Sequence, residues 1–355
     1  MIIRFFDKET LTCKGEFSRF SETTQTKYIN AIGTFSVVTD YIPQDLGLED
    51  IIFVSGPDCE EYCGQLSQIS GSITEQGGKY TFQGREIVGL LSERMPLISG
   101  ADGALLPLSV NSVKRESAIL SILDQLFTDP TLAGPRCIEQ ITHSNSLNRG
   151  ATVSYTCAPD KSALDSLYTL ALPENWGLEL IPNFETRKYD FQIIIPEEKQ
   201  IAISAKFDNL VNEQFTLSRS AHKNVAYYSH TENDATTYGC VDPDSAEGFS
   251  RKERWITAST NLSEAQARSV IIMQLGNFKP TEHFTGDYRP SETFIFGQDF
   301  TLGDFVQYSG SAGTAKKQVI GFTQTYGAGA YTKQLLFGDN LRETVRAIRQ
   351  IEGGK

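Results

Sequence analysis

The first hundred residues alternate short apolar runs with turn residues, a pattern typical of half-buried strands. The adjacent Gly77 and Gly78 tolerate positive φ angles and predict a tight hairpin turn between the last two runs. A short helix is expected from Glu86 to Glu93, before Pro96. This part of the chain is therefore interpreted as a compact β module. Its predicted strands are Ile2–Phe6, Thr34–Thr39, Ile51–Val54, Gln65–Thr74 and Lys79–Phe82.

From about residue 99 the apolar spacing becomes helical. Apolar side chains at 119, 122, 123 and 126 fall on one helical face, and Asp129-Pro130 ends that run. A second helix is predicted over Ser162–Leu172. It is followed by strands over Leu178–Ile181 and Arg187–Ile195. The pattern predicts a small α/β unit in this part of the chain.

The remaining sequence is again rich in strands. Ser263 with Gln266 forms a capping-box pattern, and Gly276 stands where that helix should end. A final helix is expected over Leu341–Ile351. The predicted strands are 201–207, 213–218, 224–230, 253–258, 304–307, 319–326 and 331–337.

The two ends of the chain repeat the same landmarks. Asp50 and Asp304 each precede an apolar run, and each is followed 34 residues later by a glycine, Gly84 or Gly338. The same offset of 254 residues pairs Leu66 with Ile320. Sequence identity is sparse, so both duplication and chance similarity of two β-meanders stay open.

The fold expected from these patterns is mainly β with α/β insertions, an α+β arrangement. Two tube-like β-barrel domains related by duplication are predicted, with smaller α/β domains between them. The expected domains are 1–98 (first barrel), 99–182 (α/β insertion), 183–285 (β-rich linker with one helix) and 286–355 (main part of the second barrel). A chain with two equivalent barrels can form a trimer that docks on a hexameric ring, because the symmetries then match.

Composition and charge narrow the possible functions. The 355 residues are 39% hydrophobic and 21% charged, which disfavours a disordered chain, and no stretch predicts a secretory signal or a membrane-spanning helix. The net charge of −12 argues against a protein that grips phosphate backbones. The short basic pairs 114–115, 251–252 and 316–317 are interpreted as solvated loop charges or subunit contacts. The six scattered cysteines predict reduced thiols of a protein made in the cytoplasm.

No motif of the sequence predicts catalysis or a cofactor. The histidines make no zinc-binding pattern, although His222 and His230 could share a strand face. Cys59 and Cys63 lack the partners of a zinc set, and neither a G-x-S-x-G elbow nor a phosphate-binding glycine loop occurs. The acidic residues that could be paired for glycoside cleavage are interpreted as surface charges. They are Glu60, Glu61, Asp242 and Asp244, and the histidines are His143, His222, His230 and His283.

Several weak motifs in a fixed order resemble the hub proteins at the tips of long-tailed bacteriophage tails, also called tail-associated or baseplate hub proteins. The resemblance is to the short form found in siphophages of Gram-positive and related hosts, and it spans most of the chain. The motifs are Gly33–Val37, Gly64–Ile73, Phe82–Gly84, Leu90–Arg94, Trp176–Leu178, Asn209-Leu210, Lys223–Val225, Arg251 with Glu253, and Leu302–Val306.

This resemblance implies a structural protein without enzyme activity, cofactor or bound metal. It implies a homotrimer whose barrels form a pseudo-six-fold ring below the hexameric distal tail protein. The ring would gate the tape-measure protein and the DNA, which passes without specific binding, and would contact tip or receptor-binding proteins. The expected location is the tail tip of the virion, after synthesis in the host cytoplasm. Because the sequence ends soon after the second predicted barrel, no appended lysozyme, peptidase or fibre domain is expected.

Exposed strand edges pair with other chains, and in a ring each neighbour covers them. The runs around Ile51, Phe53, Phe305 and Gln307 are therefore predicted to lie near subunit contacts. Two other functions stay open. One is a tail-associated cell-wall hydrolase. The other is a receptor or sugar adhesin that uses the aromatic residues Tyr227, Tyr228 and Trp255, for which packing in the core is the simpler interpretation.

Overall fold

The computed structural model of the chain describes residues 1–57, 59–74, 77–100, 103–232, 235–257, 263–290, 294–310, 313–327 and 329–338. The chain divides into two compact units, which are described separately. The larger unit holds Met1–Gln214 and Thr285–Phe337, and the smaller one holds Phe215–Phe284. The four sequence ranges expected as domains stay a prediction.

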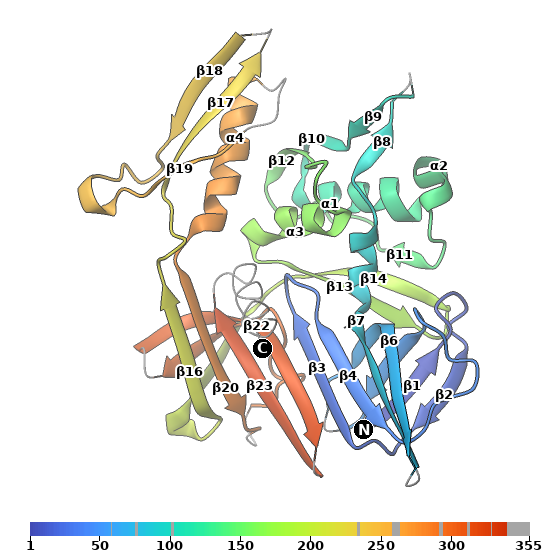
Figure 1. Cartoon of the computed structure of the whole chain (residues 1–355). Coiled ribbons are helices and arrows are strands. Elements are labelled where there is room, and N and C mark those ends of the chain that lie inside the picture. Colours follow the sequence, from blue (N-terminus) through green and yellow to red (C-terminus); the bar gives the residue numbers. More distant parts are fainter. Residues whose placement is uncertain are drawn as a thin grey trace. The chain divides into compact units, whose positions relative to one another are not determined.

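The larger unit is built on one sheet to which 13 described strands contribute (Figure 1). Its main path runs β16-β20-β23-β22-β3-β4-β7-β6-β5-β1-β2, and β15 and β21 branch from β22. The strands of the first half are β1 (Ile2–Phe6), β2 (Cys13–Phe17), β3 (Glu22–Tyr28), β4 (Thr34–Thr39), β5 (Ile51–Ser55), β6 (Tyr62–Thr74) and β7 (Gly77–Glu86). Those of the second half are β15 (Glu198–Ser204), β16 (Leu210–Ser218), β20 (Thr281–Tyr288), β21 (Phe305–Gly310), β22 (Gly313–Gly327) and β23 (Ala330–Gly338).

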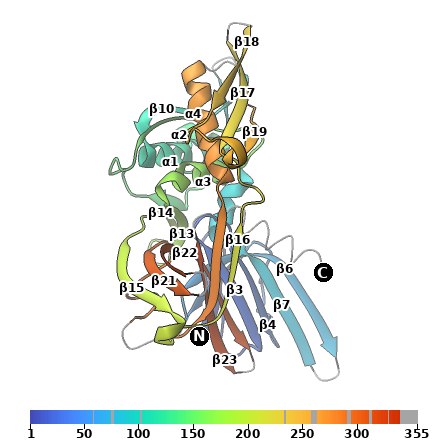
Figure 2. The same ribbon diagram turned by 90° about the vertical axis from the view of Figure 1, so that its left-hand side faces the viewer.

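The two halves of this sheet have the same strand order. The order β3-β4-β7-β6-β5 in the first half corresponds to β16-β20-β23-β22-β21 in the second. The next strands differ, because β1 is antiparallel to β5. In the second half, β15 lies beside β21 (Figure 2) and is parallel to it. The repeated order agrees with the duplication expected from the sequence, and the duplication itself stays a prediction.

The turns that lead into β5 and β21 have the same hydrogen-bond pattern and backbone conformation. The Asp50 carboxylate accepts a hydrogen bond from the Gly47 amide at 2.7 Å, and the Asp304 carboxylate accepts one from the Thr301 amide at 2.9 Å. The residue before each aspartate has a positive φ, 73° at Glu49 and 101° at Gly303.

The strand that follows each turn also pairs with its aspartate in the same way. The amides of Leu66 and Val319 donate to the carbonyls of Asp50 and Asp304, at 2.8 and 2.9 Å. Val319 rather than the predicted Ile320 therefore matches Leu66. The reason is that the first half has one more residue between the aspartate and this position.

Neither half closes into a barrel, contrary to the sequence expectation. The long strand β22 pairs with β21 through its first residues and with β3 through Gly321–Gly327. The edge of β3 is thus bonded to the other half and is not free to close on its own. The first half still encloses a core of its own, made by Ile3, Phe5, Phe17, Phe35, Val37, Ile52, Val54, Tyr62, Leu66 and Phe82.

The chain between β7 and β15 forms an α/β insertion in the larger unit. Its sheets are β11-β14-β13, β10-β12 and β8-β9. Ser162 caps α3 by accepting a hydrogen bond from the Asp165 amide at 3.1 Å, and Leu164 and Leu167 are buried. The strands are β8 (Leu97–Ser99), β9 (Leu105–Pro107), β10 (Ser109–Lys114), β11 (Ile141–His143), β12 (Thr152–Thr156), β13 (Gly177–Asn183) and β14 (Lys188–Ile194). The helices are α1 (Arg115–Leu123), α2 (Pro130–Ala133) and α3 (Ala163–Ala171), with a 3-10 helix over Ile87–Glu93, where the sequence predicted one, and a π-helical turn over Asp124–Thr128.

The smaller unit pairs a three-stranded sheet with one helix. The sheet has the order β18-β17-β19, with β17 over Val225–Glu232, β18 over Ala235–Val241 and β19 over Glu253–Trp255. Helix α4 (Glu264–Leu275) packs on it through Ala267, Ile271 and Leu275. It ends one residue before Gly276, as predicted. The side chain of Gln266 and the predicted helix over 341–351 lie outside the described residues.

Some elements differ from the sequence expectation. Gly77 and Gly78 pair with Thr74 and Ile73, so they belong to β7 and not to the hairpin turn. No strand is predicted from the sequence at the positions of β2, β3, β8, β9, β10, β11, β12, β18 and β20. Among the described residues, no helix is long and apolar enough to cross a membrane.

Candidate functional site

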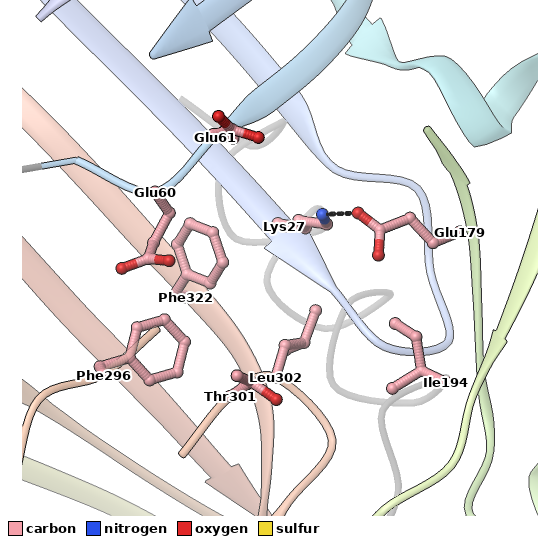
Figure 3. A pocket seen from close by; sticks show the side chains of 9 residues that line it. All are labelled: Lys27, Glu60, Glu61, Glu179, Ile194, Phe296, Thr301, Leu302 and Phe322. Atoms are coloured by element: carbon pink, nitrogen blue, oxygen red, sulfur yellow. Dashed lines mark hydrogen bonds and ion pairs between the residues drawn. The ribbon is translucent and has the colours of Figure 1, made fainter. Parts of the chain in front are cut away.

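A pocket of about 250 Å³ lies where both halves of the sheet and the α/β insertion meet (Figure 3). Lys27 comes from β3, Glu179 from β13 and Phe322 from β22, while Glu60 and Glu61 follow β5. The remaining lining residues are Ile194, Phe296, Thr301 and Leu302. The pocket therefore combines an apolar floor with four charged side chains.

Lys27 lies at one end of the pocket and forms an ion pair with Glu179 (Figure 3). Burial alone would lower the pKa of Lys27. Its acidic surroundings, chiefly the ion-pair partner Glu179, outweigh this effect and raise that pKa above its ordinary value. Lys27 therefore carries a charge and is balanced by residues that are distant in the sequence.

Behind Lys27, Glu86 is almost fully buried, with 3% of its surface exposed. Its Oε2 accepts a hydrogen bond from the Gly33 amide at 3.2 Å. Burial raises the pKa of this carboxyl to about 8, although Lys27 and the Gly33 amide favour the charged form. Burial likewise raises the pKa values of the neighbouring Tyr62 and Cys63. This group is therefore a closed, titratable cluster beneath the pocket.

The opposite end of the pocket is held by Glu60. Its Oε1 accepts a charge-assisted hydrogen bond from Lys333 Nζ at 2.5 Å, and Lys333 also lies over the Phe296 ring at 5.0 Å. The Glu60 amide donates to Gln324 Oε1 at 3.0 Å, and Gln324 Nε2 donates to the Glu60 carbonyl at 2.9 Å.

Gln324 connects this end of the pocket to the seam between β22 and β3. It also bonds Gln25 of β3, and it accepts a hydrogen bond from the Tyr331 hydroxyl at 2.6 Å. Thr24 and Thr325 are paired across the same seam. Because Gln25 and Gln324 are both fully buried, these bonds specify the register in which the two halves join.

Two of the four carboxylates considered for hydrolysis form ion pairs with basic side chains, and the other two are exposed. Glu60 is bound by Lys333, and Asp242 of the smaller unit is bound by Arg251 at 2.6 Å. Glu61 is exposed at the pocket, and Asp244 is exposed in the smaller unit. The described residues contain no group of three or more histidines, cysteines, aspartates or glutamates placed to hold a metal ion.

The residues predicted near subunit contacts have different environments. Ile51 is fully buried, and Phe53 is half-buried with its ring 5.0 Å from that of Phe184. Phe305 is half-buried with Lys316 Nζ 5.4 Å from its ring, and Gln307 is exposed. β5 and β21 are both paired on two sides within the chain, so these strands are not free edges. Their part in a subunit contact stays a prediction.

The histidines do not gather. His222 lies outside the strands and bonds the Phe278 carbonyl at 3.0 Å, whereas His230 lies on β17 beside Thr237. His222 and His230 therefore do not share a strand face. His143 is paired with Asp124 at 2.8 Å, and the cysteines at 13, 63, 137, 157 and 240 are in the thiol form.

Two of the basic residues are not solvated loop charges. Arg115 is buried and bound to Glu174 at 3.2 Å, and Lys317 is 5% exposed. Within its pair, only Lys316 is exposed.

The fold is similar to that of several solved tail proteins, two of them from prophages. Its solved neighbours include a tail protein from Neisseria meningitidis, with a TM-score of 0.58 and 11% identity over 91% of this chain and 93% of that one. The prophage MuSo2 43 kDa tail protein from Shewanella oneidensis has a TM-score of 0.59 and 9% identity, over 95% of this chain and 98% of that one. A prophage tail protein from Listeria monocytogenes has a TM-score of 0.54 and 12% identity over 99% of both chains. No family model and no curated protein matches the amino-acid sequence. At these identities the likeness is one of fold.

Proposed function

We propose that the chain is a structural hub protein of a phage tail. The observation that carries this proposal is the repeated strand order of the sheet, with its matching aspartate turns at Asp50 and Asp304. A likeness of fold to three phage tail proteins over at least nine-tenths of each chain supports the same function.

In the proposed assembly three copies form a ring. Each copy supplies two similar β halves, so the ring has pseudo-six-fold symmetry and matches a hexameric tail ring on one side and a three-fold tip on the other. The partners we propose are a second and third copy, the distal tail protein, the tape-measure protein and tip proteins. The ring belongs to the tail tip of the virion and gates the passage of the tape measure and DNA.

We further propose that the outer parts of β5 and β21 contribute to the contact between copies. Phe53 and Gln307 occupy matching positions three residues after Asp50 and Asp304, and both have side chains that reach the surface. Since both strands are already paired on two sides, the contact is made by side chains rather than by backbone pairing.

The mass of the purified protein in solution tests this proposal. The chain has a mass of 39.3 kDa, and light scattering over a range of concentrations should give three times that value. Electron-microscopy class averages of the same sample should show a ring with six similar lobes. A monomer or dimer at every concentration would contradict the trimeric ring.

A matched pair of substitutions tests the contact surface. Gln307→Arg places a charge on the exposed face of β21 and should shift the trimer towards monomer without lowering the melting temperature. Gln192→Arg changes an equally exposed glutamine on β14, outside the large sheet, and should leave the mass unchanged. If both variants have the same mass in solution, β21 does not contribute to the contact between copies.

A further inference from the structure

The sheet of the smaller unit has two different faces. Alternating residues of β17 and β18 point towards α4 and are buried, among them Ala226, Tyr228 and Val241. Tyr228 is thus a core residue, which confirms the simpler interpretation for this one aromatic side chain. Helix α4 lies along this sheet (Figures 1 and 2) and covers the face through its apolar side chains. The residues between the buried ones along the strands lie on the opposite face.

The opposite face carries a row of exposed aromatic rings. Tyr227 is paired in register with Trp255 of β19 on one side and with Cys240 of β18 on the other. Tyr238, two residues before Cys240, has its ring centroid 6.1 Å from that of Trp255. Trp255 is 51% exposed and Tyr238 is 77% exposed. A monomer rarely leaves rings so grouped in water without a binding role.

A fixed set of polar groups lies beside this row. Arg251 donates to Glu253 at 2.5 Å, to Asp242 at 2.6 Å and to the Tyr227 hydroxyl at 3.0 Å. The Tyr227 hydroxyl in turn donates to Glu253 at 3.2 Å. These bonds hold the Tyr227 ring and both carboxylates in place before any ligand arrives. Each carboxylate retains lone pairs that can accept further hydrogen bonds.

The charge of this surface selects among ligands. One guanidinium is opposed by two carboxylates, so the surface offers no excess positive charge for phosphate or for nucleic acid. A flat row of rings with hydrogen-bonding groups at its edge fits a ligand that has an apolar C–H face and a rim of hydroxyls. A pyranose ring has this combination, because its axial hydrogens form one face and its hydroxyls radiate from the edge.

We infer that the face formed by Tyr227, Tyr238 and Trp255 binds a neutral oligosaccharide. The sugar rings stack on Trp255 and Tyr238, and their hydroxyls bond Glu253, Asp242 and Arg251. This activity goes beyond the hub function and does not depend on it.

Titration with a panel of neutral oligosaccharides of glucose, galactose and N-acetylglucosamine tests the inference. The full-length protein is used, and binding is followed by tryptophan fluorescence and by calorimetry. At least one saccharide of the panel should change the fluorescence of Trp255, and this change should saturate as the saccharide concentration rises. Trp255→Ala and Tyr238→Ala should each weaken calorimetric binding about tenfold or more, because a stacked ring and its buried area are lost.

Phe249→Ala provides the matched control, since Phe249 is a fully exposed ring of the same unit that lies outside the three strands. It should keep the affinity of the unchanged protein. Tyr238 is mostly in solvent, so its removal should leave the melting temperature unchanged and a loss of binding reports on the ligand contact. The inference is overturned if no saccharide of the panel binds, or if binding survives both Trp255→Ala and Tyr238→Ala. The mass of the assembly in solution reports separately on the hub function.

Discussion

Replacing the buried Glu86 by glutamine should make the larger unit more stable at neutral pH. The carboxyl of Glu86 is packed beneath the pocket with Lys27, Tyr62 and Cys63, and its pKa is raised by burial from 4.5 to about 8. The folded chain therefore binds this proton more tightly than the unfolded chain. Its contribution to stability is complete below pH 4.5 and is lost as the pH rises towards 8.

The size of the effect follows from these two pKa values. Between pH 5 and pH 7 the free energy of unfolding of the unchanged protein should fall by roughly 2–3 kcal/mol because of this one carboxyl. Glu86→Gln keeps an oxygen that accepts the hydrogen bond from the Gly33 amide, but it has no proton to lose. The variant should therefore gain roughly 2–3 kcal/mol over the unchanged protein between pH 5 and pH 7.

The two tryptophans lie in different units of the chain, so the free energy of unfolding of the larger unit can be measured separately. Trp176 is buried in the larger unit, and Trp255 belongs to the smaller one. Urea unfolding followed by Trp176 fluorescence, in a Trp255→Phe background, reports the stability of the larger unit alone. Glu9→Gln, which changes an exposed carboxylate, should follow the pH dependence of the unchanged protein. If Glu86→Gln and Glu9→Gln show the same dependence, the buried carboxyl is not protonated in the folded state and the reasoning is refuted.

Two further substitutions test the packing around the pocket, with the same fluorescence assay. Gly33→Ala would drive its β-carbon into the Thr26 carbonyl and should cost roughly 2–3 kcal/mol; a loss within 0.5 kcal/mol, about the size of a surface effect, would show that the turn can move. Gln324→Leu removes the partner of Gln25, the Tyr331 hydroxyl and a backbone amide, and should cost roughly 2–4 kcal/mol. The same change at the exposed Gln83 should be nearly neutral, and equal losses at both positions would contradict the role of the seam.

Elements whose apolar residues recur at the strand or helix period could be predicted from the sequence. The alternation at Thr34–Thr39 corresponds to β4, and the helix predicted over Ser162–Leu172 is α3, with Ser162 as its N-cap. Strand β3, with the sequence ETTQTKY, has no such signal, because its buried positions are polar. Gln25 tolerates burial only because Gln324 lies across the seam, and no local pattern reveals that partner.

The charged groups of the pocket were missed for the same reason. Lys27 and Glu179 are separated by 152 positions, so their pairing depends on how the insertion packs against the sheet. Glu86 ends strand β7, whose sequence GGKYTFQGRE is mostly polar, so no apolar pattern marks this carboxyl as buried. Its burial is decided by the turn at Gly33, which lies 53 positions earlier.

The smaller unit is connected to the large sheet through β16 and β20, which are neighbours in that sheet. The chain therefore leaves and re-enters the scaffold at adjacent points, as a short hairpin loop would. Such an attachment allows a whole domain to be lengthened, exchanged or deleted during evolution while every strand of the scaffold keeps its partner. Chains of this fold can in this way acquire new surface specificities by recombination at a single place, while the large sheet and its register stay unchanged.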